Sequence, residues 1–185
     1  MVSVKYALSK EDYVNYYTYV MWDAPEKKKA KLKYYLRQVG FYVLVIAVLF
    51  YSGVFQYNRS VLYIYLGIML FTTAMQIFNA RNNIKKQAQK IANAANNQSI
   101  FLDTQIDISE TGISMKDELS ETKLQWKAFV KKQENADYYF LFTNSIQALI
   151  FPKRIFKTAE DKARFQQLLS QHLSFDAEVG HLIKD

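Results

Sequence analysis

The longest hydrophobic runs of the chain are uncharged and follow one another directly. Gln38–Asn58 and Ser60–Ala80 are each 21 residues long, and neither contains Asp, Glu, Lys, Arg or His. A helix of that length rises about 30 Å, which is the thickness of a hydrocarbon core. Two buried helices of this kind would need a much larger surrounding core than the rest of the chain supplies. The pattern therefore predicts a transmembrane helical hairpin with Arg59 between its two spans.

The N-terminal segment has a different pattern, which predicts one strand and one helix. Val2–Leu8 alternates apolar and polar residues with the period of a half-buried strand. Ser9 stands three residues before Asp12, which is the spacing of a capping box at the start of a helix. In Glu11–Trp22 the tyrosines and other apolar residues recur at helical spacing. We expect this stripe to pack on a sheet or to lie at the lipid interface.

After Ser99 the apolar period changes from helical to two. Six short segments separated by polar turns are typical of a small antiparallel sheet or barrel, and they are Phe101–Ser109, Ile113–Lys116, Thr122–Trp126, Phe129–Glu134, Tyr138–Thr143 and Ile146–Phe151. Thr158 then begins a helix in the manner of an N-cap. That helix places four apolar residues on one face, namely Phe165, Leu168, Leu169 and Leu173.

Together these patterns predict an α+β membrane protein made of six consecutive segments. They are an N-terminal strand and amphipathic helix (1–36), two transmembrane helices (38–58 and 60–80), a basic helical extension (81–98), a C-terminal sheet domain (99–174) and a tail (175–185). The Asn-rich end of the basic extension, Ala94–Gln98, is expected to be a flexible connection.

The chain is basic, with a formal net charge of +7 and a pI of about 9.3, which first suggests nucleic-acid binding. The positions of the charges argue against that class, because the basic residues gather beside the two uncharged runs. They are Lys27, Lys28, Lys29, Lys31, Lys33, Arg37, Arg81, Lys85, Lys86 and Lys90. We therefore expect the lipid bilayer as a partner and no nucleic acid.

The same charges predict the orientation of the hairpin. Lys and Arg close to a transmembrane segment are retained on the cytoplasmic side. They lie before the first span and after the second, whereas Gln56–Ser60 contains Arg59 alone. Both termini should be cytoplasmic, with Gln56–Ser60 as a short external turn. Residues 1–23 lack the apolar core of a cleavable signal peptide, so the first span would act as the insertion signal.

The sequence shows no pattern of catalytic or metal-binding residues. It has no cysteine, and His172 and His181 lack the spacing of metal ligands. Asp103 and Asp107 would lie about 13 Å apart along a strand, which exceeds the roughly 5–9.5 Å of a paired-carboxylate mechanism. We expect no catalytic, cofactor or metal site and no enzyme activity. The spans also lack the ionisable residues of a transport pathway.

Two places in the C-terminal segment are candidates for a binding surface. Lys153, Arg154 and Lys157 form a cationic corner beside Phe156, and this corner could hold a phosphate or an acidic peptide. The structural interpretation is favoured, in which Pro152 ends the last strand, Phe156 is buried and the cations are solvated. Trp126 with Phe129 is either an exposed contact or part of the core, and the core is favoured because a small barrel needs large apolar side chains.

The segment ETKLQWKAFVKKQENADYYFLFTNSIQALIFPKRIF, which begins at Glu121, resembles the C-terminal region of the YcxB-like proteins of bacteria. The features that carry the resemblance are a Trp before a strand, a strand rich in Tyr and Phe, and Pro152-Lys153-Arg154 followed by Phe156. The opening VKYALSKEDYVNYYTY is similar to the N-terminal strand and helix of the family. The resemblance implies a bacterial plasma-membrane protein with a cytoplasmic, pleckstrin-homology-like barrel closed by a C-terminal helix. Val2–Leu8 would supply its seventh strand.

These inferences lead to a functional hypothesis of a membrane-anchored, non-enzymatic binding or scaffolding module. One alternative is an accessory subunit of a membrane transport or envelope complex, with Gly67, Thr72 and Ala74 at the helix interface. Another is a module that binds anionic lipid. The sequence leaves open which membrane or cytoplasmic protein is the partner and how many copies assemble.

Overall fold

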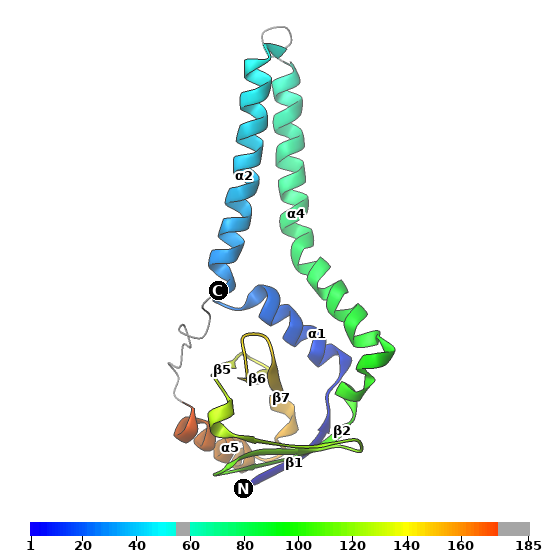
Figure 1. Ribbon diagram of the computed structural model, residues 1–185, viewed down its shortest axis with the longest axis vertical. Coiled ribbons are helices and arrows are strands. Elements are labelled where there is room, and N and C mark those ends of the chain that lie inside the picture. Colours follow the sequence, from blue (N-terminus) through cyan, green and yellow to red (C-terminus); the bar gives the residue numbers. More distant parts are fainter. Residues whose placement is uncertain (55–59, 174–185) are drawn as a thin grey trace. The chain divides into compact units, whose positions relative to one another are not determined.

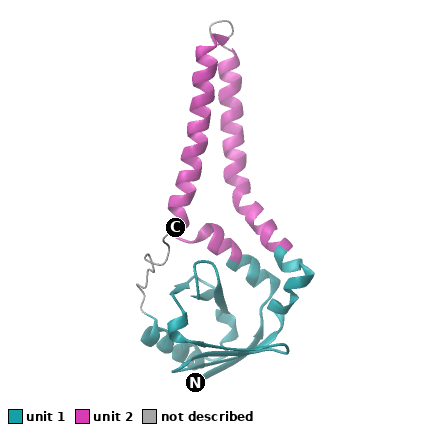
Figure 2. Cartoon of the chain, in the orientation of Figure 1, with its two compact units in different colours: residues 1–16, 91–185 teal, residues 17–90 magenta. Residues whose placement is uncertain are grey.

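The computed structural model describes residues 1–54 and 60–173, and these fall into two compact units (Figure 2). One unit, here called the sheet unit, consists of residues 1–16 and the chain from 91 onward, and the other, the hairpin unit, of residues 17–90. The predicted segment 1–36 is therefore divided between both. The expected external turn around Arg59, the tail 175–185 and His181 lie outside the described residues.

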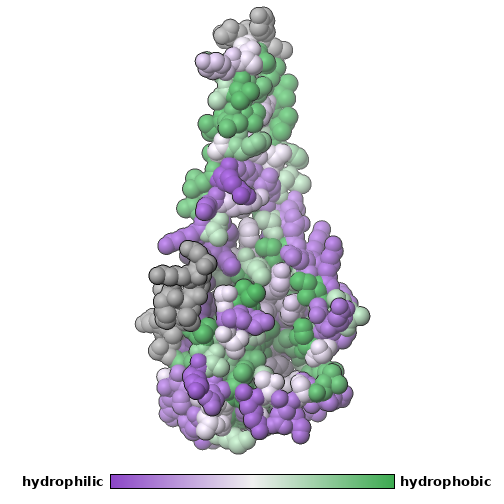
Figure 3. All heavy atoms as spheres, in the orientation of Figure 1, coloured by the Kyte–Doolittle hydropathy of each residue, from purple (hydrophilic) through white to green (hydrophobic). Residues whose placement is uncertain are grey.

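The hairpin unit contains two long apolar helices, α2 (Lys27–Tyr51, 25 residues) and α4 (Ser60–Asn93, 34 residues). A π-helix, η1 (Tyr19–Asp23), precedes α2. Both long helices are apolar enough over 18 residues or more to cross a membrane, and none of that apolar window is buried within the structure. In Figure 3 hydrophobic side chains gather on the upper part of this pair of helices, and hydrophilic side chains lie on the lower part. Long helices are thus present at both uncharged runs, and α4 continues through the basic segment as expected. However, α2 ends at Tyr51, inside the first predicted span (38–58), and residues 55–58 of that span lie outside the described residues.

Polar side chains connect α2 to α4 within the hairpin unit. The Tyr42 hydroxyl lies 2.8 Å from the Thr72 hydroxyl, and the Tyr65 hydroxyl donates to the Tyr42 carbonyl at 3.2 Å. The Tyr34 hydroxyl donates to Gln76 at 3.1 Å. In a low-dielectric environment such hydrogen bonds satisfy groups that lipid cannot, so they favour a closed pair of helices.

The sheet unit begins with a four-stranded antiparallel sheet in the order β1-β2-β3-β4. The strands are β1 (Val2–Ala7), β2 (Asp103–Ser109), β3 (Gly112–Lys116) and β4 (Glu121–Gln125). Val2 pairs with Ile108 and Ala7 with Asp103, so β1 matches β2 along its whole length. Figure 1 shows β1 (blue) beside β2 (green), although both long helices separate them in the sequence. The predicted N-terminal strand is confirmed.

A second, three-stranded antiparallel sheet follows in the order β5-β6-β7. Its strands are β5 (Lys131–Glu134), β6 (Tyr138–Phe142) and β7 (Ala148–Pro152). All six strands predicted after Ser99 therefore form, with boundaries shifted by one to two residues. Every side chain of β6 is buried, which agrees with its continuous aromatic and aliphatic sequence rather than with an alternating pattern.

The expected closed barrel is not formed by the described residues. A 3₁₀ turn, η3 (Trp126–Ala128), separates β4 from β5, so the two sheets share no strand ladder there. On the opposite side β1 meets β7 through a side chain, because the Tyr6 hydroxyl donates to the Ile150 carbonyl at 2.5 Å. The architecture is therefore two antiparallel sheets with helices, which corrects the barrel prediction.

The core of the sheet unit lies between the two sheets and under helix α5 (Ala159–His172). Thr158 caps α5, since its hydroxyl accepts a hydrogen bond from the Asp161 N–H at 3.0 Å. The four predicted core residues of this helix are all buried, and they are Phe165, Leu168, Leu169 and Leu173. Trp126 and Phe129 are also buried in this core, as the sequence favoured.

The Asn-rich segment that was expected to be flexible is a 3₁₀ helix, η2 (Ala95–Phe101). Its side-chain amides bond to carbonyls at the end of α4, from Asn97 to Ile91 at 2.9 Å and from Gln98 to Ala92 at 3.3 Å. These bonds satisfy carbonyls that a helix C-terminus leaves unpaired, which explains why amide-rich residues form an ordered turn here.

Candidate functional site

Helix α1 (Lys10–Thr18) starts with the predicted capping box. The Asp12 N–H donates to the Ser9 hydroxyl at 3.0 Å, and the Ser9 N–H donates to the Asp12 carboxylate at 2.9 Å. These reciprocal bonds satisfy two backbone donors at the helix start. The local sequence therefore places Asp12 on the first turn of α1 with its carboxylate held in position.

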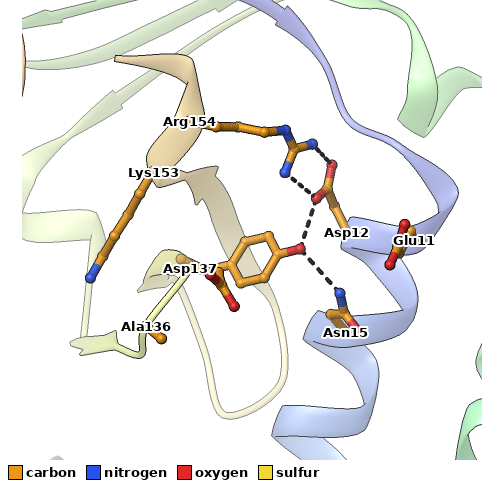
Figure 4. A pocket seen from close by; sticks show the side chains of 8 residues that line it. Glu11, Asp12, Asn15, Ala136, Asp137, Lys153 and Arg154 are labelled. Carbon is orange, nitrogen blue, oxygen red and sulfur yellow. Dashed lines mark hydrogen bonds and ion pairs between the residues drawn. The ribbon is translucent and has the colours of Figure 1, made fainter. Parts of the chain in front are cut away.

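The same carboxylate makes a second set of bonds to residues distant in the sequence (Figure 4). Arg154 donates to it from two guanidinium nitrogens, at 2.8 and 2.5 Å, and the Tyr138 hydroxyl donates to it at 2.9 Å. Asn15, one turn along α1, donates to the Tyr138 oxygen at 3.1 Å. A fork-shaped pair of this kind is among the strongest hydrogen-bonded contacts between side chains. It fixes the first turns of α1 to β6 and to the 3₁₀ turn Lys153–Ile155 that follows β7.

Asp12 and Arg154 differ in their access to solvent. The Asp12 side chain is only 2% exposed, whereas the Arg154 side chain is 58% exposed. Burial raises the pKa of Asp12, but the hydrogen bonds from Arg154, Ser9 and Tyr138 outweigh it and hold the pKa below its ordinary value of 3.8. The bond to Asp12 likewise raises the pKa of Arg154. Asp12 is thus a buried, permanently charged group at neutral pH.

Tyrosine side chains strengthen the attachment of α1 to the second sheet. The ring of Tyr16 lies 5.5 Å from that of Phe140 in β6, and its hydroxyl donates to the Ile146 carbonyl. Burial raises the pKa of Tyr16 to about 12. The apolar stripe predicted on this helix therefore packs on a sheet here, which was one of the two expected environments.

A cleft of about 560 Å³ opens beside the Asp12–Arg154 pair. Its walls come from α1, from the β5–β6 turn and from the segment after β7, and its lining residues are Glu11, Asp12, Asn15, Ala136, Asp137, Tyr138, Lys153 and Arg154. In the described part of the chain, the carboxylates of Glu11 and Asp137 have no hydrogen-bond or ion-pair partner. The cleft thus offers charge and hydrogen-bonding groups to a polar ligand.

The predicted cationic corner lies partly in this cleft, but the charges of Lys153 and Arg154 are paired within the chain. Lys153 binds the Glu134 carboxylate at 2.6 Å and lies 4.9 Å above the ring of Tyr139. Arg154 binds Asp12, as described above. Lys157 is exposed and does not line the cleft. The structure therefore brings Lys153 and Arg154 to one cleft and leaves Lys157 apart.

The remaining candidate residues have structural contacts in the sheet unit. His172 stacks on Trp126 with ring centroids 5.1 Å apart, and its Nε2 lies 3.3 Å from the Glu110 carboxylate. The His172 side chain is 29% exposed. Asp107 accepts a hydrogen bond from Ser3 at 2.6 Å. Among residues 1–54 and 60–173, no group of three or more His, Asp or Glu could hold a metal ion.

The basic residues beside the uncharged runs all lie on the two long helices. Lys27, Lys28, Lys29, Lys31, Lys33 and Arg37 belong to α2, and Arg81, Lys85, Lys86 and Lys90 belong to α4. Arg81 makes a forked contact with Asp23, its shortest N–O distance being 2.8 Å. The Lys31 ammonium lies 4.8 Å from the ring centre of Trp22.

Sequence reasoning did not find Asp12, Asn15 or Tyr138 as parts of a site. The capping box alone accounts for an aspartate at position 12, and the buried strand alone accounts for a tyrosine at position 138. The sequence carries no signal that joins either of them to Arg154, because their contact depends on how α1 packs against the second sheet.

In the comparison with protein-family models, residues 108–169 match the family described as YcxB-like protein. The matched region runs from the end of β2 into α5 and includes Trp126, the aromatic strand β6 and the Pro152-Lys153-Arg154 segment. The resemblance inferred from these residues is therefore confirmed for this region. No curated protein and no solved structure matches the chain.

Proposed function

We propose that this chain is a membrane-anchored, non-enzymatic binding or scaffolding module of the bacterial plasma membrane. In this proposal, α2 and α4 cross the bilayer and the pleckstrin-homology-like sheet unit lies in the cytoplasm. The observation that carries the proposal is the position of the hairpin in the sequence. It interrupts one sheet between β1 and β2, which pair along the whole length of β1.

The pairing of β1 with β2 supports a topology with two crossings. β1 precedes α2 and β2 follows α4, yet both strands belong to one hydrogen-bonded sheet. An open sheet edge cannot lie in hydrocarbon, because its backbone groups would be unsatisfied. In this proposal both ends of the hairpin therefore lie on one side of the bilayer. The basic residues beside the spans favour the cytoplasm as that side.

The binding role is assigned to the cleft between α1 and the β5–β6 turn. Clefts lined by a few convergent polar groups are the usual place for a ligand or a partner side chain. Here the Asp12–Arg154–Tyr138 network holds the walls in place, and Glu11 and Asp137 remain available for contact. This combination suits recognition and provides no nucleophile paired with a base, which catalysis would require.

Photocrosslinking in native membranes tests the proposal. A photoreactive amino acid is placed at Ala136, which is exposed in the cleft, and in a second variant at Leu119, which is exposed in the β3–β4 turn. We expect a discrete crosslinked product from the Ala136 position that the Leu119 position does not give. A cleft with no product, or the same products at both positions, would argue against a binding module.

A second candidate function, an accessory subunit that binds through its transmembrane helices, is supported by the position of Gly67. An added Cβ at Gly67 would meet no atom within 4 Å, so this residue does not serve the contact between α2 and α4. Ala74, seven residues later, is also exposed, whereas Thr72 bonds to Tyr42 inside the hairpin. The predicted interface is therefore reduced to Gly67 and Ala74.

Leucine substitutions separate the two candidates. Gly67→Leu with Ala74→Leu should abolish co-purification of a membrane complex if the helices form the interface. The same double variant should leave crosslinking from Ala136 unchanged if the cleft is the binding site.

A further inference from the structure

The first turns of α2 carry a dense group of positive charges, here called the lysine cluster and defined as Lys27, Lys28, Lys29, Lys31 and Lys33. Because α2 begins at Lys27, all five lysines are helical and lie within two turns. The helix has no acidic residue in its first turn, and Glu26 makes no side-chain cap. Cations at a helix N-terminus oppose the helix dipole. Anions bound near the cluster would therefore stabilise the start of α2.

The hairpin unit itself supplies little negative charge. Asp23 and Glu26 are the only acidic residues between positions 17 and 90 of the sequence. Asp23 is already bound by Arg81 in a forked contact. In the part of the unit that the structure describes, no ion pair joins any lysine of the cluster to a carboxylate. The compensating anions must come from outside this unit.

The continuation of α2 identifies the source of these anions. The helix runs without a break from the lysine cluster into the uncharged segment that begins at Gln38. Lys33 precedes Gln38 by about 7 Å along the helix axis, which is the depth of a phospholipid headgroup layer. Trp22, a residue type that favours this layer, lies 4.8 Å from the Lys31 ammonium. Both features suit lipid phosphates.

We propose that the lysine cluster, with Trp22, is a binding site that enriches anionic phospholipids around the cytoplasmic end of α2. The inference rests on the proposed function, since it requires α2 to cross a bilayer. It goes beyond that function by assigning a lipid class and a location. The site selects headgroups by charge, and Trp22 packs against the Lys31 side chain at the level of the headgroups.

Fluorescence quenching of the full chain in vesicles tests this site directly. The chain has two tryptophans, and Trp126 is buried in the core of the sheet unit, so bromine on lipid chains reports mainly on Trp22. Two vesicle preparations are compared. One preparation contains brominated phosphatidylglycerol mixed with unlabelled phosphatidylcholine. The other contains brominated phosphatidylcholine mixed with unlabelled phosphatidylglycerol.

We expect phosphatidylglycerol to associate with Trp22 about fivefold or more strongly than phosphatidylcholine, since each lysine near an anionic surface contributes a factor of about five. Replacing the five lysines of the cluster by glutamine should bring the ratio close to one. About 1 M salt should do the same, because it shortens the screening length to about 3 Å.

A matched control removes the same number of positive charges from a different part of the chain. Five exposed lysines of the sheet unit are replaced by glutamine, namely Lys5, Lys116, Lys123, Lys127 and Lys157. This variant should keep the full preference for phosphatidylglycerol. Equal loss in both variants, or equal quenching by both brominated lipids in the unaltered chain, would overturn the inference. Absence of quenching by either lipid would instead contradict the membrane anchoring itself.

Discussion

At the scale of single residues, the Asp12 carboxylate is the group on which the candidate site depends. It accepts hydrogen bonds from Ser9, Tyr138 and Arg154 while its side chain is almost fully buried. A buried charge that keeps only part of its partners is costly, since its lost hydration is no longer compensated. The stability of the sheet unit should therefore respond more strongly to Arg154 than its exposure suggests.

Replacing Arg154 by glutamine should lower the free energy of unfolding by about 2 kcal/mol, because Asp12 would remain buried with only its bonds from Ser9 and Tyr138. For a unit of this size the midpoint of thermal unfolding should fall by about 10 °C. The near-ultraviolet circular dichroism of Trp126 in detergent micelles follows this transition. Lys157→Gln is the matched control and should shift the midpoint by no more than about 2 °C.

The double variant Asp12→Asn with Arg154→Gln checks the cause of that loss. Without the buried charge, the cost of losing Arg154 should shrink, so the double variant should be more stable than the sum of the single effects predicts. Strict additivity would show that the pair does not interact in the folded protein.

The pH dependence of stability follows from the lowered pKa of Asp12. A carboxyl whose pKa is lower in the folded state stabilises the fold above its unfolded pKa, close to 3.8, and loses that contribution as the pH falls through the folded value. Unfolding should therefore become easier below about pH 4. Asp12→Asn should be less stable at pH 7 and show a shallower loss between about pH 5 and 2. Urea unfolding at stepped pH measures both slopes, and parallel slopes would contradict the account.

Much of the residue-level picture was open to prediction because it depends on local spacing. The Ser9–Asp12 capping box, the Thr158 cap and the buried face of α5 all follow from residues within one or two turns of each other. The pairing of Asp12 with Arg154 did not follow, since nothing local distinguishes a capping carboxylate from one that also binds a distant guanidinium.

At the scale of elements, a single residue, Gly112, permits the pairing of β3 with β4. Gly112 begins β3 with a φ of +149°, and an added Cβ would lie 2.1 Å from the Leu124 carbonyl of β4. That distance is far below any real contact, and the opposing atom is backbone. The four-stranded sheet can therefore form only with glycine at this position.

Gly112→Ala should destabilise the sheet unit by about 3 kcal/mol, through backbone strain and the displacement of β4. The variant should lose much of its Trp126 near-ultraviolet signal at temperatures where the unaltered chain is folded. Gly67→Ala is the matched control, because its Cβ would meet no atom within 4 Å. Equal unfolding temperatures for the two variants would refute this role of Gly112 in the four-stranded sheet.

The order of elements was predictable from apolar periodicity, whereas the arrangement of the sheets was not. Alternation identified the strands, but it does not state which strands share a ladder. The 3₁₀ turn at Trp126–Ala128 ends β4 before it can pair with β5, and this feature converts an expected barrel into two sheets. The Asn-rich turn after α4 was likewise misjudged, because its order depends on amide contacts to carbonyls at the end of that helix.

At the scale of the whole molecule, the arrangement follows from where the hairpin is inserted. Two apolar helices lie between the first and second strands of one sheet. Withdrawal of β1 from that sheet would uncover Ile106 and Ile108, which are buried. In the proposed membrane topology, folding of the sheet unit requires that the chain return to the side of the bilayer from which it left, so anchoring and folding would be coupled through β1.

Single-cysteine labelling in intact bacterial cells tests the proposed topology, since the chain has no cysteine of its own. Cysteines are introduced one at a time at Glu11 before the two long helices, at Glu118 after them and at Ser60, the first residue of α4. A membrane-impermeant maleimide should label Ser60→Cys only, while Glu11→Cys and Glu118→Cys should react only after the membrane is opened. Labelling of Glu11→Cys and Glu118→Cys from opposite sides, or protection of all three positions to the same degree, would contradict the account.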